Sequence, residues 1–400
     1  MAARADAALI QIHERYRQEL AGFCYRMLGS PFDAEDAVQE TLLRAWRGMH
    51  GFEGRASLRV WLYRIATNVC LDMLQQRGRR ALPMHVGPAG NADVSLGEAD
   101  PGDTWVQPAP DTLVLPADAD PADLAILRDT VRLAFVAALQ HLSPQQRAVL
   151  ILRDVLRWRA NEVAQLLDTT VAAANGMLRR ARTKLSGLTP ADSRVNQLDA
   201  GQTTLLRRYV EAFERSDIDA LIGLLHEDAT LSMPPYRLWL SGADEIGRWF
   251  ARDPNPCADS RVVPLHANGS PAFASYHTAV GRTDYSAFAI HILTLRDTRI
   301  AGIDLHLNPE LFRLFGLPVR LELEDPAMKK AGSGGSGVVP SAIHGTRKAH
   351  ALREHEPPTS GPNAPQPELS GSGRPWNGSD SMGSPTRHPN GCRPQPGVTA

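Results

Sequence analysis

The chain has 400 residues, of which 43% are hydrophobic and 22% charged, as in ordinary globular proteins of two or three domains. Its net charge of −1 does not by itself indicate a polyanion as partner. No run approaches the roughly 20 apolar residues that span a membrane, and the N-terminal MAARADAALI lacks the apolar core of a secretion signal. We therefore expect a cytoplasmic protein. The four cysteines are scattered without a C-x-x-C pair, so neither a disulfide framework nor a zinc site is expected.

The first part of the chain is predicted to be helical. Apolar residues recur every three or four positions from Leu9 to Met27, which predicts an amphipathic helix. The sequence Gly29-Ser30-Pro31 ends this helix, and Asp33 is predicted as the N-cap of the next. Ser57 is suited to cap a third helix.

Two of these helices have charged and aromatic residues on their polar faces, a combination that is unusual for a surface that contacts only solvent. The stretch DAEDAVQETLLRAWR, residues 33–47, has three carboxylates in its first four residues and Arg-Ala-Trp-Arg at its end. In the third helix an aromatic, a guanidinium and an amide share one face, because Trp61, Arg64, Asn68 and Asp72 are three or four residues apart. Such a face suits nucleic acid, since aromatics stack on unpaired bases and Arg and Asn reach base edges. The alternative is that Trp61 belongs to the core and the arginines are solvated.

Residues 81–125 differ sharply in composition. They are rich in Pro, Gly, Ala and Asp, with no sustained periodicity, and we expect an acidic, mostly extended linker between two domains. The acidic residues of this linker are Asp93, Glu98, Asp100, Asp103, Asp111, Asp118, Asp120 and Asp123.

Helical periodicity then resumes. Ser143-Pro144-Gln145-Gln146 has the order of a capping box. Two short helices joined by a tight turn follow, and the second, from Val171 to Leu185, has an apolar side and a basic outer side. This is the helix-turn-helix arrangement, whose second helix reads the DNA major groove. The alternative is that the pair only packs against other helices.

The C-terminal part is predicted to begin with two helices and to continue as a curved antiparallel sheet. Candidate pocket residues in it are His226, Asp228, Tyr236, Trp239, His266, His277, Asp284, His291 and His306. No acid and base have a spacing that demands catalysis, so we expect these side chains to be structural, and we expect no enzymatic activity, cofactor or metal. Apolar stretches at 233–246 and 308–318 are predicted to form a docking surface.

Three of these segments resemble a known family. DAEDAVQETLLRAWRG, SLRVWLYRIATNVCLDMLQQRGRR and LSPQQRAVLILRDVLRWRANEVAQLLDTTVAAANGMLRRARTKL look like regions 2 and 4 of bacterial RNA polymerase sigma factors of the extracytoplasmic-function (ECF) group of the sigma-70 family. The C-terminal part resembles a SnoaL-like (NTF2-like) domain. Together they resemble the SigG/SigJ-like type of ECF sigma factor.

The resemblance implies a multidomain fold: two all-α sigma domains followed by an α+β SnoaL-like domain and a disordered tail. The expected boundaries are 8–80 for the region 2 helical bundle, 81–125 for the acidic linker, 126–188 for the region 4 helix-turn-helix, 199–320 for the SnoaL-like domain and 326–400 for the tail. The linker is expected to run near the polymerase active centre, where its acidic residues would mimic nucleic acid.

The resemblance also implies partners and site residues. Core RNA polymerase, through its β′ clamp and β subunits, is expected to bind Asp33, Glu35, Asp36, Gln39, Glu40, Arg44 and Trp46. The −10 element of promoter DNA is expected to contact Trp61, Arg64, Asn68, Asp72, Arg77, Arg79 and Arg80. The −35 element is expected to contact Thr169, Thr170, Ala172, Ala173, Asn175, Arg179, Arg180 and Arg182.

For the C-terminal domain we expect regulation of sigma activity, with a possible small ligand in its pocket. Two other classes of protein stay open at this point. One is a helix-turn-helix regulator that binds DNA without polymerase, and the other is a SnoaL-like enzyme fused to a DNA-binding module. The acidic and aromatic helix at 33–47 favours the sigma factor over both.

Overall fold

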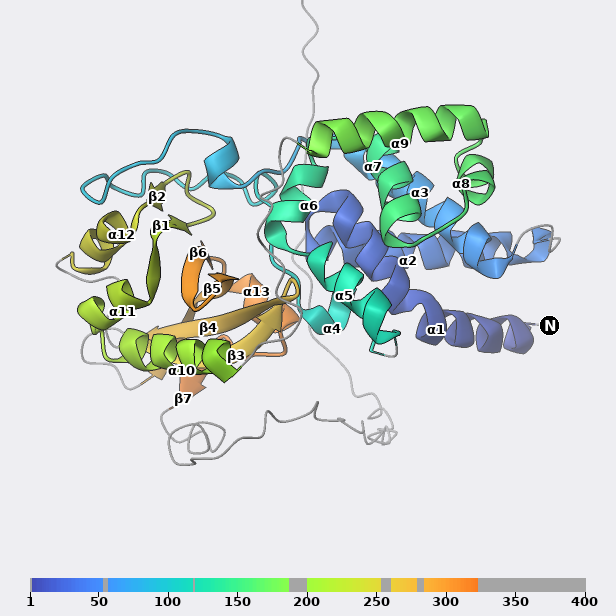
Figure 1. Cartoon of the computed structure of the whole chain (residues 1–400). Helices are drawn as coiled ribbons and strands as arrows, with labels where there is room; N and C mark the ends of the chain where they lie inside the picture. Colours follow the sequence, from blue (N-terminus) through green and yellow to red (C-terminus); the bar gives the residue numbers. More distant parts are fainter. Residues whose placement is uncertain are drawn as a thin grey trace, which may run out of the picture. The chain divides into compact units, whose positions relative to one another are not determined.

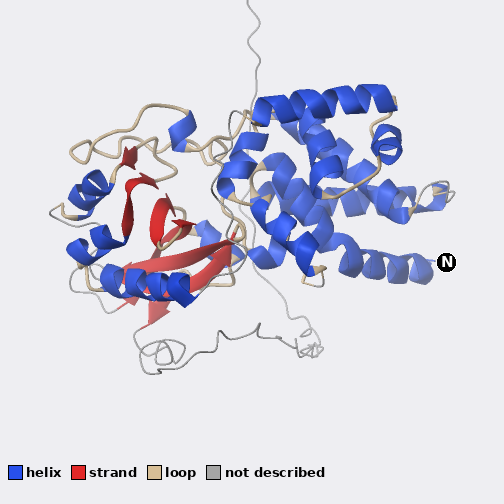
Figure 2. Ribbon diagram, in the orientation of Figure 1, coloured by secondary structure: helices blue, strands red, loops and turns tan. Residues whose placement is uncertain are grey.

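A computed structural model describes residues 2–52, 57–117, 119–186, 200–252, 260–278 and 284–322, and the side chains within them from residue 15 onward except that of residue 50. The predicted tail 326–400 lies outside this range, as do Cys257, Cys392 and Asp118. Figure 2 shows that helices make up the N-terminal half, whereas the strands belong to the C-terminal part. Among the described helices, none is both long and apolar enough to cross a membrane.

The N-terminal half is built from helices and single turns. The helices are α1 (Ala2–Leu28), α2 (Pro31–Gly48), α3 (Leu58–Gln76), α4 (Asp111–Val114), α5 (Pro121–Asp129), α6 (Leu133–Leu139), α7 (Pro144–Leu150), α8 (Ala160–Leu166) and α9 (Val171–Leu185), with 3-10 turns η1 (Met49–Gly51) and η2 (Pro83–His85) and a π-helical turn η3 (Ile151–Val155). In Figure 1, α8 and α9 form the pair of helices that the sequence predicted as a helix-turn-helix.

Side-chain caps fix where α2, α3 and α7 begin. Ser57 caps α3, and Ser143 forms the predicted capping box at α7. The predicted cap of α2 is wrong by three residues: Ser30 is the N-cap, and its hydroxyl accepts a hydrogen bond from the backbone N–H of Asp33. Pro31 at the first helical position explains the earlier start, because its fixed φ suits a helix and it has no N–H to satisfy.

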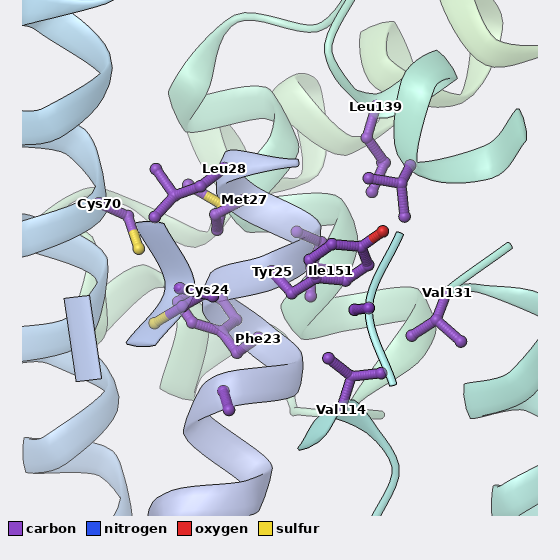
Figure 3. Packing of buried hydrophobic residues seen from close by; sticks show 14 of the residues in the cluster. Phe23, Cys24, Tyr25, Met27, Leu28, Cys70, Val114, Val131, Leu139 and Ile151 are labelled. Atoms are coloured by element: carbon purple, nitrogen blue, oxygen red, sulfur yellow. The ribbon is translucent and has the colours of Figure 1, made fainter. Parts of the chain in front are cut away.

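One hydrophobic core joins α1, α2 and α3 to α6, α7, α8 and α9. Phe23 of α1 packs edge-on against Tyr63 of α3, with ring centroids 5.2 Å apart. Figure 3 shows Phe23 and Cys24 of α1 near Cys70 of α3, with Val131, from the segment between α5 and α6, and Ile151 of η3 in the same cluster. Cys24 and Cys70, the two cysteines that the structure describes, are buried free thiols.

The linker is less extended than predicted. It contains η2 and α4, and Trp105 pairs with Ala81 in an isolated parallel bridge. Val106, Ala109 and Val114 of the linker are fully buried in the core that contains α1. A stretch without helical periodicity therefore packs through single apolar residues, which periodicity alone does not detect.

The C-terminal part is a sheet with helices. Its elements are α10 (Ala200–Glu214), α11 (Ile218–Leu224), β1 (Leu225–Ser232), β2 (Trp239–Ser241), α12 (Ala243–Phe250), β3 (Ser260–Ala267), β4 (Ser270–Thr278), β5 (Asp284–Arg296), β6 (Arg299–His306), α13 (Glu310–Leu314) and β7 (Arg320–Glu322). The strand order is β2-β1-β6-β5-β4-β3, and β7 pairs with β5. Only β1 and β6 run parallel among the paired strands described.

The two faces of the sheet bury different partners. Phe273 of β4 and Leu293 of β5 belong to a core with α10, α11 and α12, and Figure 1 shows α10 crossing this sheet. Their alternating neighbours Ala272, Ala274 and Tyr276 belong to the core that contains α1. Because side chains alternate between the faces of a strand, β4 contributes to both cores and joins the C-terminal sheet to the N-terminal helices.

Candidate functional site

An apolar groove runs along the outer side of α2. Its cavity volume is about 610 Å³, and its walls come from α1, α2 and Leu113 of α4. Trp46 and Leu43 are 46% and 48% exposed at this groove, large values for apolar side chains. Arg17 of α1 donates a hydrogen bond of 2.5 Å to Glu35, and exposed Gln39 adds a polar group beside them. An apolar groove with a polar rim is typical of a protein-binding surface.

Asp33 and Arg80 are not on the surfaces where the sequence placed them. Both are 6% exposed, and the Arg80 guanidinium donates to the Asp33 carboxylate over 2.8 Å. Arg80 also donates to the backbone oxygens of Gly102 and Trp105 over 3.0 and 2.9 Å, while Arg77 pairs with Asp33 from the other side. In this form the two residues hold the linker against α2, and neither is free to contact a partner.

The polar face predicted on α3 is present. Arg64, Asn68 and Asp72 are exposed, whereas Trp61 is half-buried and packs against Phe52 with ring centroids 4.9 Å apart. Both alternatives for Trp61 hold in part, because its indole packs against Phe52 and remains partly exposed.

The polar faces of α2 and α3 are connected. Arg44 of α2 donates to Glu40 over 2.7 Å and to Asp72 over 3.1 Å. Hydrogen bonds to these two carboxylates raise the pKa of Arg44. Both ion pairs are exposed and therefore add little to the stability of the fold. Their main effect is to position the three side chains relative to one another.

The basic helix α9 exposes most of the residues predicted to contact DNA. Its buried side is Ala174, Leu178, Ala181 and Leu185, and the outer residues Ala172, Ala173, Asn175, Arg179 and Arg180 are exposed. Two predicted contacts have a structural task as well. Thr170 caps the helix by accepting from the N–H of Ala173, and Arg182 pairs with Asp154 through hydrogen bonds of 2.9 and 2.6 Å.

The predicted pocket residues of the C-terminal domain do not come together in one site. His226, Asp228 and Arg296 form an ion-pair cluster at the surface. On the face toward α10, Tyr209 lies 3.0 Å from His291 Nδ1, and His291 Nε2 lies 2.9 Å from the Ser275 hydroxyl. This buried chain satisfies both imidazole nitrogens. It has the form of a core network, without a free acid or base.

Burial keeps three histidines of this sheet neutral. Burial lowers the pKa of His277 to about 4 and those of His291 and His306 to about 3, because the imidazolium would lose its hydration. Asp304, which was not predicted from the sequence, is half-buried on the opposite face from His291 and accepts from Ser232 over 2.6 Å. Burial raises the pKa of this carboxyl.

The turn between β3 and β4 connects the C-terminal domain to the N-terminal helices through buried hydrogen bonds. Asn268 is fully buried, and its amide nitrogen donates to the Tyr25 hydroxyl and to the Val131 carbonyl, each over 2.6 Å. Its amide oxygen accepts from the N–H of Ala109 over 2.8 Å. The next residue, Gly269, donates its N–H to Asp111 over 2.8 Å. One turn therefore binds α1, the linker and the segment after α5.

Sequence reasoning missed this contact, although a signal was present. An Asn-Gly pair between two strand-like runs is a strong hairpin signal, and both residues have positive φ. The sequence indicates the turn, but its partner Tyr25 is distant in the chain.

The segment 233–246, predicted as a docking surface, docks the linker. Trp239 donates its indole N–H to the Gly87 carbonyl over 3.0 Å, and Trp105 donates its own to the Pro235 carbonyl over 2.9 Å. Arg237 adds a paired hydrogen bond to the linker carboxylate of Asp100. The second stretch, 308–318, packs inward through Phe312. Its Asn308 and Leu311 line a small cavity together with Trp105 of the linker. We call residues 233–246, which make the hydrogen bonds to the linker, the linker-binding surface.

The family models that match the chain are sigma-70 region 2 over residues 12–80, sigma-70 region 4 over 132–185 and the SnoaL-like domain over 206–303. The chain is 46% identical over 313 residues to the ECF RNA polymerase sigma factor SigG of Mycobacterium tuberculosis H37Rv, over 76% of this chain and 82% of that protein. It is 30% identical over 326 residues to SigJ of the same organism, over 78% and 95%. The chain belongs to the ECF family of RNA polymerase sigma factors.

As a sigma factor, the protein binds RNA polymerase and promoter DNA and directs transcription initiation, and it is not an enzyme. The family decides against both alternative classes considered from the sequence. The crystal structure of SigJ from M. tuberculosis shares the fold, with a TM-score of 0.50 at 24% identity over 78% of this chain and 99% of that one.

The neutral state of His306 predicts a pH-dependent stability. Because its folded pKa of about 3 lies below the usual value of 6.5, its contribution is complete above pH 6.5 and is lost as the pH falls toward 3. Between pH 5.5 and 4.5, the free energy of unfolding of the wild type should fall by about 1.4 kcal/mol more than that of His306→Leu. Urea denaturation at both pH values measures this difference. Equal losses for the two proteins would show that His306 is protonated in the folded state.

Proposed function

We propose that the groove on α2 is the surface by which this sigma factor binds the β′ clamp of the polymerase. Support comes from its exposed Trp46 and Leu43 beside charges of both signs. The mixed charge would orient the encounter, while the apolar groove supplies affinity. The proposed contacts are Glu35, Asp36, Gln39, Glu40, Arg44 and Trp46.

We further propose that α3 reads the −10 element and α9 the −35 element. The exposed Arg64, Asn68 and Asp72 with the edge of Trp61 suit unpaired bases. On α9, small residues at the N-terminal end would let the helix approach the major groove, where Asn175 can read a base edge. Thr169, Arg77, Arg79, Arg179 and Arg180 would serve these DNA contacts, mainly to phosphate, and Arg182 would do so if its pair with Asp154 opened.

For the C-terminal domain we propose inhibition by docking. The observation that carries this is the buried turn at Asn268, which binds the linker at Ala109 and Asp111 as well as α1. In the family the linker is expected to enter the polymerase near the active centre. A linker held by this turn and by the linker-binding surface at 233–246 cannot do so at the same time. Docking therefore competes with polymerase binding.

The groove on α2 leads to a prediction for Trp46. Trp46→Ala should weaken binding of the sigma factor to actinobacterial core polymerase at least tenfold, because truncating an aromatic hot spot costs about 2 kcal/mol or more and about 1.4 kcal/mol corresponds to a factor of ten. Fluorescence anisotropy of the labelled sigma factor measures the affinity. Val319→Ala, which truncates another exposed apolar residue at a distant site, is the control. Unchanged binding by Trp46→Ala would remove the groove from the proposed interface.

The docked turn leads to a second prediction. Gly269 has φ +64°, and a Cβ there would lie 2.7 Å from the Arg128 carbonyl oxygen, so Gly269→Ala should undock the turn. Gly316 has φ +70° with nothing within 4 Å, so Gly316→Ala has the same backbone strain without the clash.

Run-off transcription on promoters selected from genomic fragments, with actinobacterial core polymerase, compares the two variants. We expect several-fold more transcript from Gly269→Ala than from the wild type or Gly316→Ala. Equal yields from all three proteins would contradict inhibition by docking, and a selective decrease for Gly269→Ala would mean that the docked domain activates.

A further inference from the structure

A second cavity, of about 340 Å³, opens where regions 2 and 4 meet the linker. Its walls come from α1 (Gly22, Arg26), α3 (Arg59), the linker (Val114, Ala119) and the end of η3 (Val155). This volume is within the range of small-molecule sites. The cavity lies apart from the groove on α2 and from the pocket residues of the C-terminal domain.

The charged group at the inner wall is Arg26. Its side chain is 1% exposed, and its guanidinium donates to the carbonyls of Gly22 and Leu127 and to the Thr130 hydroxyl. All three acceptors are neutral, and no described carboxylate pairs with Arg26. Burial lowers its pKa to about 10, which reflects the cost of a cation without a counter-charge.

The other charges around the cavity compensate one another. Arg59 donates to Glu19 over 2.9 Å, so this pair adds no net charge. Asp123 and Arg157 lie at the exposed rim and have opposite signs. Among the described side chains around the cavity, this leaves Arg26 as the cation without a counter-charge, next to apolar walls that include Val114.

We propose that this cavity binds a small apolar monoanion, an organic carboxylate whose charged group faces Arg26 and whose hydrocarbon part fills the space between Val114, Ala119 and Val155. A carboxylate would supply the counter-charge that the buried guanidinium lacks. A neutral ligand of the same shape would gain only the apolar contacts.

Because of where the cavity lies, a ligand bound in it would lower the transcription activity of the sigma factor. Its walls belong to region 2, the linker and region 4, so a bound molecule contacts all three and stabilises their closed packing by mass action. The ligand would act as a co-inhibitor, and this second step rests on the inhibition by docking proposed above. Binding itself does not depend on it.

The binding test uses 2-naphthoate as the probe, with the full chain, by isothermal titration calorimetry. We expect a dissociation constant on the order of 1 mM or tighter and at least tenfold weaker binding of 2-naphthamide, its neutral isostere. Ala119→Trp should fill the cavity and weaken naphthoate binding at least tenfold. Ala122→Trp, three residues further on at an exposed position outside the cavity, should bind as the wild type does.

Three results would overturn the proposal: no binding of naphthoate to the wild type, equal binding of the amide, or equal binding by Ala119→Trp and the wild type. The comparison of naphthoate with the amide uses only the wild-type protein, so it tests the proposal even if Ala119→Trp fails to fold. Run-off transcription with naphthoate separates the two proposals. Binding without lower transcript would leave the site in place and count against the inhibitory role of the closed packing.

Discussion

The closed arrangement of this sigma factor depends on one buried amide. Asn268 makes three side-chain hydrogen bonds, to Tyr25, Val131 and Ala109, and has no exposed surface. A buried polar group that loses its hydrogen-bond partner costs about 1–3 kcal/mol. Partly undocked forms of the turn are therefore unfavourable, and the turn is either fully docked or fully undocked. That property makes the contact a switch between two states, because a partially undocked turn would keep unsatisfied groups buried.

Two buried arginines complete the closed packing. Arg26 of region 2 donates to the carbonyl of Leu127, near the end of α5. Arg147 of region 4 donates to the carbonyl of Met27 in α1 and to that of Leu139 in α6. Cations are stabilised at helix C-termini by the unpaired carbonyls and the helix dipole. These bonds stabilise the packed state, but no carboxylate in the described part of the chain pairs with either guanidinium. A buried cation without a counter-charge is costly, so the two regions are held together without a large excess of stability.

The sequence predicted local features better than contacts between distant residues. The caps at Ser57 and Ser143 and the buried side of α9 follow from patterns within a few residues, and the structure has them. The burial of Asp33 was missed because its partner Arg80 lies 47 residues away and no periodic signal links them. The docking of Asn268 was missed for the same reason, and the linker because its burial depends on single apolar residues. The walls of the cavity at Arg26 come from α1, α3, the linker and η3, which are distant in the sequence, so no local pattern indicates it.

The central claim is that free protein is closed and opens on binding polymerase. Double electron–electron resonance between spin labels at Gln75→Cys in α3 and Thr183→Cys in α9, both exposed, tests it directly in a Cys257→Ser, Cys392→Ser background. We predict one narrow distance distribution for the free protein, a broader one for Gly269→Ala, and a longer mean distance with core polymerase. A broad distribution in the free wild type, or a distance that polymerase does not change, would contradict the account.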